Sequence, residues 1–332
     1  MLGEHLLDRL QVGGAPGTLP PSPVRFADGA HYRIEIPSVE GPEVCAAVVD
    51  ECARRQVPLH RVSQGSGVTM LTRQERTDLA ELGAAEEIEV SLYVRPTASW
   101  ATGAAWLAPT GRPLAGQVHG VAQLAAALDQ VERAVASGFR SVLVTDVGVI
   151  AAIAELKREG ALPADLTVKA GVQLSVANPM SARVVAGLGA TTINVPSDAS
   201  LADLAAIRRN VDVPLDIYVE SPDDLGGFVR AHEIADIVRV AAPVYLKFGL
   251  RNAPPQYPGG THTQDIAVRL ARERVRRAQL GLELLTEIDA ALVTSTSRGS
   301  DLGVPEPGTP FQPVAAAPTC LHRPVSPARP QE

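Results

Sequence analysis

The stretch Pro243-Val-Tyr-Leu-Lys-Phe-Gly-Leu-Arg251 decides how the rest of the chain is interpreted, because its two faces differ in character. Apolar and other residues alternate along it with a period of two, which is the period of a β-strand. The apolar row suits packing on helices. The opposite row carries Lys247 and Arg251, and buried cations need anionic partners or an anionic ligand. We expect this to be the last strand of a barrel with a polar interior.

Outward from this strand, short apolar runs alternate with helical patterns. Eight strand–helix units in roughly 260 residues are typical of an α/β (β/α)8 TIM barrel. The expected strands are 32–37, 59–63, 88–95, 141–146, 166–176, 191–195, 214–220 and 244–251, and the expected helices are 42–55, 73–87, 121–137, 149–158, 179–188, 201–210, 228–238 and 266–292. Thr72 and Ser200 are predicted helix caps. A doubly wound sheet is the alternative, but Gln64-Gly-Ser-Gly67 is too short for its phosphate loop.

The predicted domain organisation is a single barrel over residues 31–293. Residues 1–30 form an N-terminal extension and linker, and the tail 294–332, rich in Pro, Ser and Thr, is expected to be disordered. The long loop 96–120 carries both tryptophans, Trp100 and Trp106. Loops of this length are usually functional or disordered, so we favour a lid over a surface loop pinned by two aromatic side chains.

The composition argues against several classes of protein. The net charge is −7, and because acidic and basic residues are interspersed we expect no nucleic acid partner. No run reaches the ~20 apolar residues of a membrane span, and Glu4 and Asp8 stand where a signal peptide would be basic and then apolar. We therefore expect no membrane association and a cytoplasmic location. Cys45 and Cys52 lie about 10 Å apart on one predicted helix, too far for a disulfide.

The interior of the predicted barrel is unusually polar, whereas barrel interiors are normally filled with Val, Ile and Leu. The expected inward residues are Arg33, Glu35, Pro37, Leu59, Arg61, Ser63, Glu89, Ser91, Tyr93, Arg95, Lys169, Gly171, Gln173, Ser175, Thr192, Asn194, Pro196, Asp216, Tyr218, Glu220, Tyr245, Lys247, Gly249 and Arg251. In the fourth strand Thr145 and Asp146 compete for the inward position. Many charged groups converging near the carboxyl ends of strands indicate an active site.

These residue types predict a site for a small anionic substrate. Arg61, Arg95 and Arg251 offer planar forks that match carboxylate or phosphate groups. Lys169 and Lys247 are crowded by other cations, which should lower their pKa values and suit a general base or an imine-forming nucleophile. The predicted catalytic residues are Lys247, Lys169, Glu220 and Tyr218, and the predicted substrate-binding residues are Arg61, Ser63, Arg95, Gln173, Asn194, Arg251 and His262. Asp146 and Glu220 are the candidate ligands for a divalent metal such as Mg or Mn.

The leading functional hypothesis is a lyase or isomerase that removes a proton from a carbon next to a carbonyl group. A metal-assisted hydrolase of the peptidase type and a non-catalytic ligand-binding barrel are the alternatives. Glu35, Asp216 and the two inward lysines could instead form a satisfied interior ion network. The long last helix could cover the bottom of the barrel or mediate a homo-oligomer.

Part of this pattern resembles the barrel domain of the collagenase-like peptidase family, over residues 140–252. The similar features are Asp146 after an apolar strand, the strand with Lys169 and Gln173, Asn178 beyond it, and Leu246-Lys-Phe-Gly-Leu-Arg251. In that family a late strand reads roughly F-K-I-E-G-R, but Phe248 and Gly249 stand here in place of the Glu. The four-cysteine iron–sulfur set of its hydroxylase-like branches is absent too. The resemblance therefore implies the barrel fold, and we do not take the activity from it.

Overall fold

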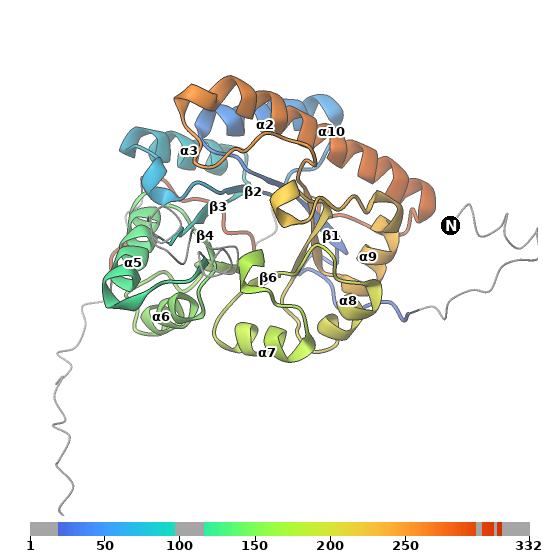
Figure 1. Cartoon of the computed structure of the whole chain (residues 1–332), viewed down its shortest axis with the longest axis horizontal. Helices are drawn as coiled ribbons and strands as arrows, with labels where there is room; N and C mark the ends of the chain where they lie inside the picture. The colour runs from blue at the N-terminus through green and yellow to red at the C-terminus, as the bar shows by residue number, and fades with distance from the viewer. Residues whose placement is uncertain (1–18, 97–115, 297–300, 309–310, 314–332) are drawn as a thin grey trace, which may run out of the picture.

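The computed structural model describes residues 19–96, 116–296, 301–308 and 311–313. Its eight strands are all parallel and close into a barrel in sequence order, with β8 pairing to β1 (Figure 1). The strands are β1 (Tyr32–Pro37), β2 (Arg61–Gln64), β3 (Glu89–Tyr93), β4 (Ser141–Val144), β5 (Thr167–Ala170), β6 (Thr192–Asn194), β7 (Leu215–Glu220) and β8 (Val244–Phe248). The predicted (β/α)8 barrel is confirmed.

Helices surround the barrel and cover the outer face of the strands (Figure 1). They are α2 (Pro42–Arg55), α3 (Arg73–Ala85), α5 (Gly120–Ala136), α6 (Val147–Arg158), α7 (Pro179–Gly187), α8 (Leu201–Arg208), α9 (Ile234–Ala241) and α10 (Gln264–Ile288). The outward residues Ile34 and Ile36 of β1, and Leu246 and Phe248 of β8, are at most 1% exposed. These side chains belong to one apolar core between strands and helices.

Short polar residues begin several of these helices. Thr72 and Glu75 form a capping box at α3, and Ser200 and Asp203 form another at α8. Each box satisfies backbone N–H groups that have no partner within the helix. The two caps expected from the sequence are therefore confirmed.

The strands end earlier than the alternation of the sequence suggests. β5 ends at Ala170 and β8 at Phe248, whereas the patterns continue to residues 176 and 251. Each end is followed by a glycine in a crowded position. A Cβ atom on Gly171 would lie 2.5 Å from the Thr145 side chain, and one on Gly249 would lie 2.9 Å from the Glu220 carbonyl oxygen. The chain turns there because neighbouring loops approach the backbone closely.

The N-terminal segment reaches the amino-terminal end of the barrel. Phe26 packs edge-on against Tyr245, with ring centroids 5.4 Å apart, and its ring lies 4.0 Å from the Arg33 guanidinium. The Ser22 hydroxyl donates to the Ala242 carbonyl oxygen. Residues before the predicted boundary at 30 therefore pack on the barrel.

Part of the C-terminal segment lies at the same end. Asp301 forms an ion pair with Arg33 at 2.7 Å, and Glu306 forms one with Arg140 at 2.8 Å. Arg33 and Arg140 are buried, and buried guanidinium groups need carboxylate partners. The packed region thus continues past the predicted boundary at 293, and residues 301–308 do not follow the expectation of a disordered tail.

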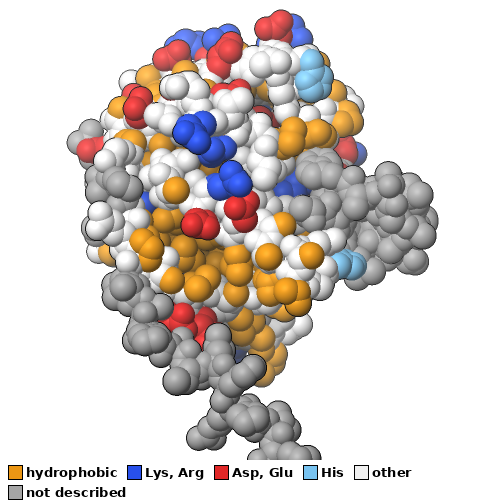
Figure 2. Space-filling view, turned by 90° about the vertical axis from the view of Figure 1, so that its left-hand side faces the viewer, with side chains coloured by type: hydrophobic (Ala, Val, Ile, Leu, Met, Phe, Trp, Pro, Cys, Tyr) orange, Lys and Arg blue, Asp and Glu red, His pale blue; other side chains and the backbone are white. Residues whose placement is uncertain are grey.

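One face of the molecule carries a group of exposed apolar side chains (Figure 2). Figure 2 shows apolar side chains gathered on one face, the left-hand side of Figure 1, where α5 and α6 lie. Large exposed apolar residues include Val121 and Val147, at the first turns of α5 and α6. Within the described ranges, no helix combines the length and apolar character needed to cross a membrane. Trp100 and Trp106, and with them most of the predicted lid, lie outside the described residues.

Candidate active site

A small pocket opens where the strands end, at the carboxyl-terminal side of the barrel. Its volume is about 100 Å³, which is less than that of a typical drug-sized site. Predicted site residues that line it are Ser63, Arg95, Gln173, Asn194, Tyr218 and Lys247, and further lining residues include Ser38, Tyr93, Asp224 and Tyr257. The structure thus brings six of the predicted residues together from six strands and their following turns.

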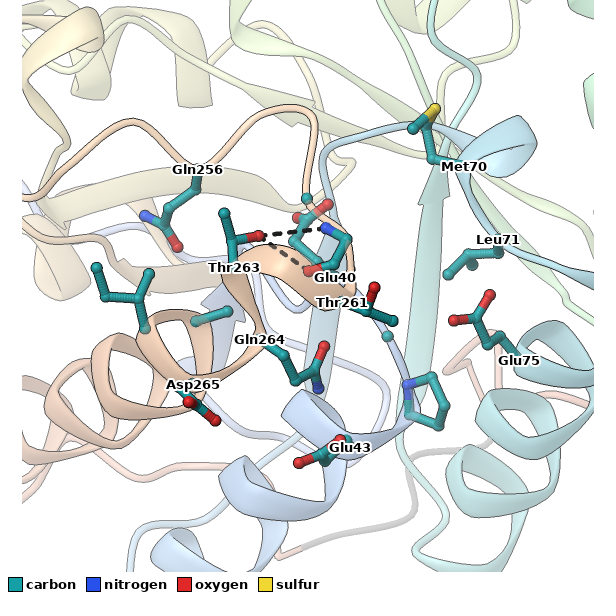
Figure 3. Close-up of a pocket in the computed structure, with 16 residues that line it drawn as sticks. Glu40, Glu43, Met70, Leu71, Glu75, Gln256, Thr261, Thr263, Gln264 and Asp265 are labelled. Carbon is teal, nitrogen blue, oxygen red and sulfur yellow. Dashed lines mark hydrogen bonds between the residues drawn. The ribbon is translucent and has the colours of Figure 1, made fainter.

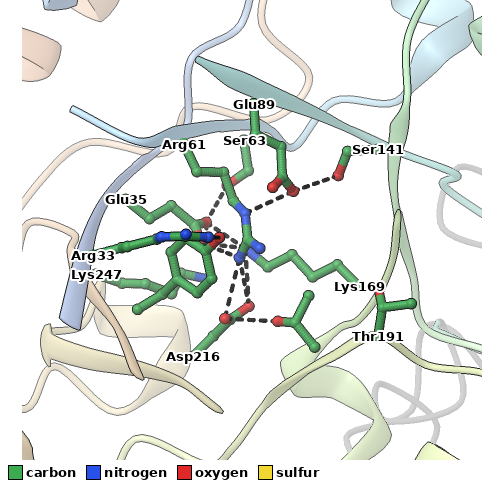
Figure 4. A network of polar contacts seen from close by, with 12 residues as sticks. Arg33, Glu35, Arg61, Ser63, Glu89, Ser141, Lys169, Thr191, Asp216 and Lys247 are labelled. Atoms are coloured by element: carbon green, nitrogen blue, oxygen red, sulfur yellow. Dashed lines mark hydrogen bonds and ion pairs between the residues drawn. The ribbon is translucent and has the colours of Figure 1, made fainter. Parts of the chain in front are cut away.

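An ion network fills the barrel beneath this pocket (Figure 4). Its charged side chains are at most 2% exposed; they are Glu35, Arg61, Glu89, Lys169, Asp216 and Lys247. Three cations and three carboxylates make this set neutral when every group is ionised. The sequence analysis allowed such a network as the alternative to an active site. The structure contains the network and, next to it, the pocket.

Arg61 lies at the centre of the network. Its Nη1 is 3.1 Å from Asp216 Oδ1 and 3.2 Å from Glu35 Oε2, and its Nε is 2.8 Å from Glu89 Oε1. The guanidinium also stacks on Tyr245, 3.5 Å from the ring centroid. Arg61 does not line the pocket, so the predicted substrate contact does not fit this geometry. Three carboxylates already surround its guanidinium.

Lys169 is equally enclosed. Its Nζ lies 2.5 Å from both carboxylate oxygens of Glu35 and 3.3 Å from Asp216 Oδ2, and the side chain is fully buried. Burial lowers the pKa of Lys169 to about 8, because desolvation and the nearby cations Lys247 and Arg61 outweigh the two carboxylates. The lowered pKa agrees with the sequence expectation. The predicted catalytic role needs access to substrate, however, and Lys169 does not line the pocket.

Lys247 connects the network to the pocket. Its Nζ donates to Asn194 Oδ1 at 2.8 Å, in the amide orientation that also lets Asn194 donate to the Asp216 carbonyl oxygen at 3.1 Å. The same Nζ lies 3.5 Å from Glu35 Oε1 and 4.2 Å from the centroid of the Tyr218 ring. Lys247 is therefore a cation that Glu35 and Asn194 hold in place, and its side chain forms part of the pocket wall.

Glu35 holds this arrangement in place. Burial alone would raise its pKa, but Lys169, Lys247 and Arg61 hold the pKa of Glu35 well below its usual range. The Ser63 hydroxyl donates to Glu35 Oε1 at 2.7 Å. Glu35 consequently stays ionised and positions both lysines.

Arg95 lies at the mouth of the pocket among tyrosines. Its Nη1 donates to the Gly65 carbonyl oxygen at 2.7 Å, and its guanidinium lies 5.4 Å from the centroid of Tyr93 and 5.7 Å from that of Tyr257. The Tyr93 hydroxyl bonds Thr145 Oγ1 at 3.0 Å. Thr145, and not Asp146, therefore takes the inward position of the fourth strand.

Besides Arg61 and Lys169, three more predicted site residues lie outside the pocket. Glu220 Oε1 accepts from the Arg251 backbone N–H at 3.0 Å, and its Oε2 is 3.7 Å from Arg277 Nε. A register shift between Tyr218 and Glu220 breaks the alternation of β7, so Glu220 does not continue the inward row. The Arg251 and His262 side chains are exposed. We therefore no longer place Glu220, Arg251 or His262 at the reaction centre.

Asp146 serves as a helix cap. Its Oδ1 accepts from the Val149 backbone N–H at 3.0 Å and its Oδ2 from that of Val118 at 2.9 Å, which fixes the start of α6. Throughout the described ranges, no group of three or more His, Cys, Asp or Glu side chains could hold a metal ion. The metal site predicted from Asp146 and Glu220 thus lacks a donor set there, and we derive no step through a metal.

Two pocket residues escaped the sequence analysis. Asp224 lies in the turn Asp223–Leu225 after β7, and Tyr257 lies in the loop after β8. Desolvation at the pocket, followed by the neighbouring charge of Asp223, raises the pKa of Asp224. The signal that could have found them is their position after a barrel strand, where catalytic loops are expected. Strand alternation does not extend into such turns.

A larger pocket of about 390 Å³ lies outside the barrel interior, between the starts of α2, α3 and α10 (Figure 3). Two of its carboxylates accept hydrogen bonds from backbone N–H groups. Glu40 accepts from the Gly65 and Ser66 N–H groups at 2.9 Å each, and Glu75 accepts from the Thr72 N–H at 2.7 Å. Among the described residues its lining contains no Lys, Arg, His or Tyr. The smaller pocket does contain Lys, Arg and Tyr side chains, so we consider it the better candidate for an active site.

The comparisons with known proteins agree with a partial family resemblance. Residues 117–221 match the model of peptidase family U32, which confirms the resemblance to the collagenase-like peptidases over this part of the chain. A U32 peptidase structure is 20% identical, with 63% of this chain and 72% of that chain covered and a TM-score of 0.36. No curated protein matches the chain.

Two further similar structures are enzymes. A truncated 3-deoxy-D-arabino-heptulosonate 7-phosphate synthase from Thermotoga maritima is 14% identical, with 80% of this chain and 90% of that chain covered and a TM-score of 0.41. N-(5'-phosphoribosyl)anthranilate isomerase from Pyrococcus furiosus is 14% identical, with 75% and 99% covered and a TM-score of 0.40.

Proposed function

We propose that this chain is an enzyme of the lyase or isomerase type that acts on a small anionic molecule through Lys247. One observation carries the proposal. Of the three cations in the buried ion network, only Lys247 also lines the pocket at the carboxyl ends of the strands. A cation held by a buried carboxylate and facing a small pocket is a preorganised partner for developing negative charge.

The charge of the pocket suits an anionic substrate. In the described part of the lining, Arg95 and Lys247 are the cations and Asp224 is the carboxylate. A carboxylate or phosphate group would be attracted to the two cations. The small volume suits a keto acid, a hydroxy acid or a small phosphate ester better than a peptide.

The proposed reaction begins with proton abstraction by Asp224 from a carbon next to a carbonyl group. The electron pair of the broken C–H bond moves onto the carbonyl oxygen, where Lys247 and Tyr218 stabilise the negative charge. Lys247 acts here as a cation, since its Nζ lies beside the Glu35 carboxylate and donates to the Asn194 amide oxygen. The Tyr218 hydroxyl makes no hydrogen bond to the described residues and can donate to this oxygen.

A peptidase-like hydrolase is the second candidate, because the sequence match to family U32 favours it. The described lining of the pocket offers Ser38 and Ser63 as nucleophiles and no Cys or His. Ser63 already donates to Glu35 and Ser38 bonds the Tyr257 hydroxyl at 2.6 Å. A cytoplasmic location and a homo-oligomer stay predictions from the sequence.

The test is proton exchange with the solvent. The full chain is incubated in deuterated buffer with separate keto acids, hydroxy acids and sugar phosphates, and C–H loss is followed by proton NMR. We expect exchange in at least one compound, its loss in Lys247→Met and its retention in Lys157→Met, a control on α6. Borohydride trapping should leave Lys247 unmodified, whereas a trapped adduct would establish imine chemistry instead. Peptide cleavage without any exchange would overturn the proposal in favour of the hydrolase.

A further inference from the structure

The loop after β8 runs between two pockets at the carboxyl-terminal side of the barrel. Tyr257 lines the smaller pocket of about 100 Å³, whereas its neighbours Gln256 and Gly259 line the larger pocket of about 390 Å³. The larger pocket lies between the starts of α2, α3 and α10, which follow β1, β2 and β8 in the chain (Figure 3). Both pockets therefore belong to the same side of the barrel, and this loop is placed to separate them.

Hydrogen bonds join this loop to the loops after β1 and β2. The Gly259 N–H donates to Ser66 Oγ at 2.7 Å. Glu40, which lines the larger pocket, accepts from the Gly65 N–H at 2.9 Å, and Gly65 lines the smaller pocket. The two pockets are therefore divided by a single layer of residues that three loops contribute.

The Tyr257 ring is the part of this layer that faces the smaller pocket. A Cβ atom on Gly65 would lie 2.4 Å from Tyr257 Cε1 and 2.7 Å from its Oη, so the ring packs directly on the Gly65 backbone. The hydroxyl bonds Ser38 Oγ at 2.6 Å, which fixes the far end of the ring. The Arg95 guanidinium lies 5.7 Å from the ring centroid. Tyr257 is thus a fixed wall beside a cation that the proposed substrate would contact.

We propose that Tyr257 is a specificity-determining residue, which limits the substrate to a short anion by closing the smaller pocket toward the larger one. Because it names the size of the substrate, this proposal rests on the proposed function. Without the ring, the space over Gly65 would extend the smaller pocket toward Glu40. The described lining of the larger pocket has no Lys, Arg or His, and its carboxylates are Glu40, Glu43, Glu75 and Asp265. A longer chain that ends in a cation would fit there, and one that ends in a second carboxylate would be repelled.

The first test measures binding and needs no turnover. Acetate, adipate and 6-aminohexanoate are each titrated with the full chain and followed by ligand-observed NMR. We expect Tyr257→Ala to bind 6-aminohexanoate about 10-fold more tightly than the parent does, since the additional methylene groups gain room. Adipate should gain no affinity. Tyr257→Phe keeps the ring and should retain the preference of the parent for acetate. Tyr257 is 37% exposed, so its truncation does not empty a core position.

A second variant moves the wall without removing the tyrosine. The backbone of Gly65 is outside the left-handed region, so Gly65→Ala adds only a methyl group, which must displace the Tyr257 ring. We expect a shift toward 6-aminohexanoate that is smaller than in Tyr257→Ala. Gly187→Ala is the matched control and should show no shift, because its added methyl group would meet nothing within 4 Å. Equal affinity of 6-aminohexanoate for the parent, Tyr257→Ala and Gly65→Ala would refute the proposal.

The exchange assay extends the test to turnover. The parent should prefer pyruvate to 2-oxohexanoate in kcat/KM, and Tyr257→Ala should reduce this preference by about 10-fold, the scale on which a pocket discriminates between chain lengths. An unchanged preference in folded Tyr257→Ala would contradict the role of the ring. If no compound undergoes exchange in any variant, the proposed function fails, and the binding titrations still decide whether Tyr257 limits the length of a bound anion.

Discussion

The two ends of the barrel interior use similar side chains for different purposes. At the amino-terminal end, the buried Arg33 and Arg140 each meet a carboxylate of the C-terminal segment, Asp301 or Glu306. At the carboxyl-terminal end, Lys247 shares Glu35 with two other cations and also lines a pocket. The amino-terminal end, here called the lower end, therefore neutralises its charges within the chain. The carboxyl-terminal end, here called the upper end, keeps cationic groups beside a space that a ligand can enter.

This difference follows the general division of labour in such barrels. Side chains at the amino-terminal face mainly stabilise the fold, and the loops at the carboxyl-terminal face carry the chemistry. The ion network between the two ends belongs to both, since Glu35 positions Lys169 for stability and Lys247 for the pocket. Substitutions at the two ends should consequently separate stability from activity.

The largest effect is expected in the network itself. Lys169→Met should lower the free energy of unfolding by about 3–5 kcal/mol, because it leaves the buried Glu35 and Asp216 carboxylates with too little positive charge. Denaturant unfolding measures the change. Lys157→Met is the matched control and should lose much less. A stable Lys169→Met variant with no activity would instead return Lys169 to the catalytic residues.

The next effect concerns the upper end. Lys247→Met should lower the rate of proton exchange by at least 10²-fold, as expected when a preorganised charge partner is lost. Lys247→Arg keeps the charge and should retain more activity. The exchange assay and denaturant unfolding are measured on the same samples. A loss of rate only in proportion to unfolded protein would show that Lys247 is structural, like Lys169.

Substitutions at the lower end should affect stability alone. Asp301→Asn removes the charge paired with the buried Arg33, and we expect a loss of about 1–2 kcal/mol in unfolding free energy, since Asp301 is itself 39% exposed. Glu306→Gln should act similarly on Arg140. The exchange rate per folded molecule should not change, and a lower rate would contradict the separation of the two ends.

The smallest effect is a shift of the pH dependence. The carboxylate form of Asp224 is the proposed base, and its pKa is raised above the ordinary 3.8 by desolvation and by Asp223. Activity should therefore fall as the pH decreases through this raised pKa. Asp223→Asn removes a neighbouring negative charge and should move the acidic limb of kcat/KM to lower pH by a fraction of a unit. Asp224→Asn should abolish the limb together with most of the activity.

The sequence predicted the fold better than the site. The alternation along 243–251, repeated in the other apolar runs, was enough to predict the barrel and the polar interior row. Six predicted residues line the pocket, including Lys247, Tyr218 and Arg95. The assignment of Glu220 to the interior was wrong, because the register shift in β7 interrupts the period of two on which it depended. Asp224 was missed, because the turn that carries it has no periodicity.

The sequence by itself determined the strand and helix order, the helix caps at Thr72 and Ser200, and the presence of charged residues inside the barrel. These features depend on residues close in the chain, whose spacing can be read directly. Tertiary structure alone decided which buried charge meets which. Lys169 and Glu35 are 134 positions apart, and Arg33 and Asp301 are 268 apart. Whether a lysine is neutralised by a carboxylate or faces a pocket depends on distances between strands and loops that local sequence does not contain.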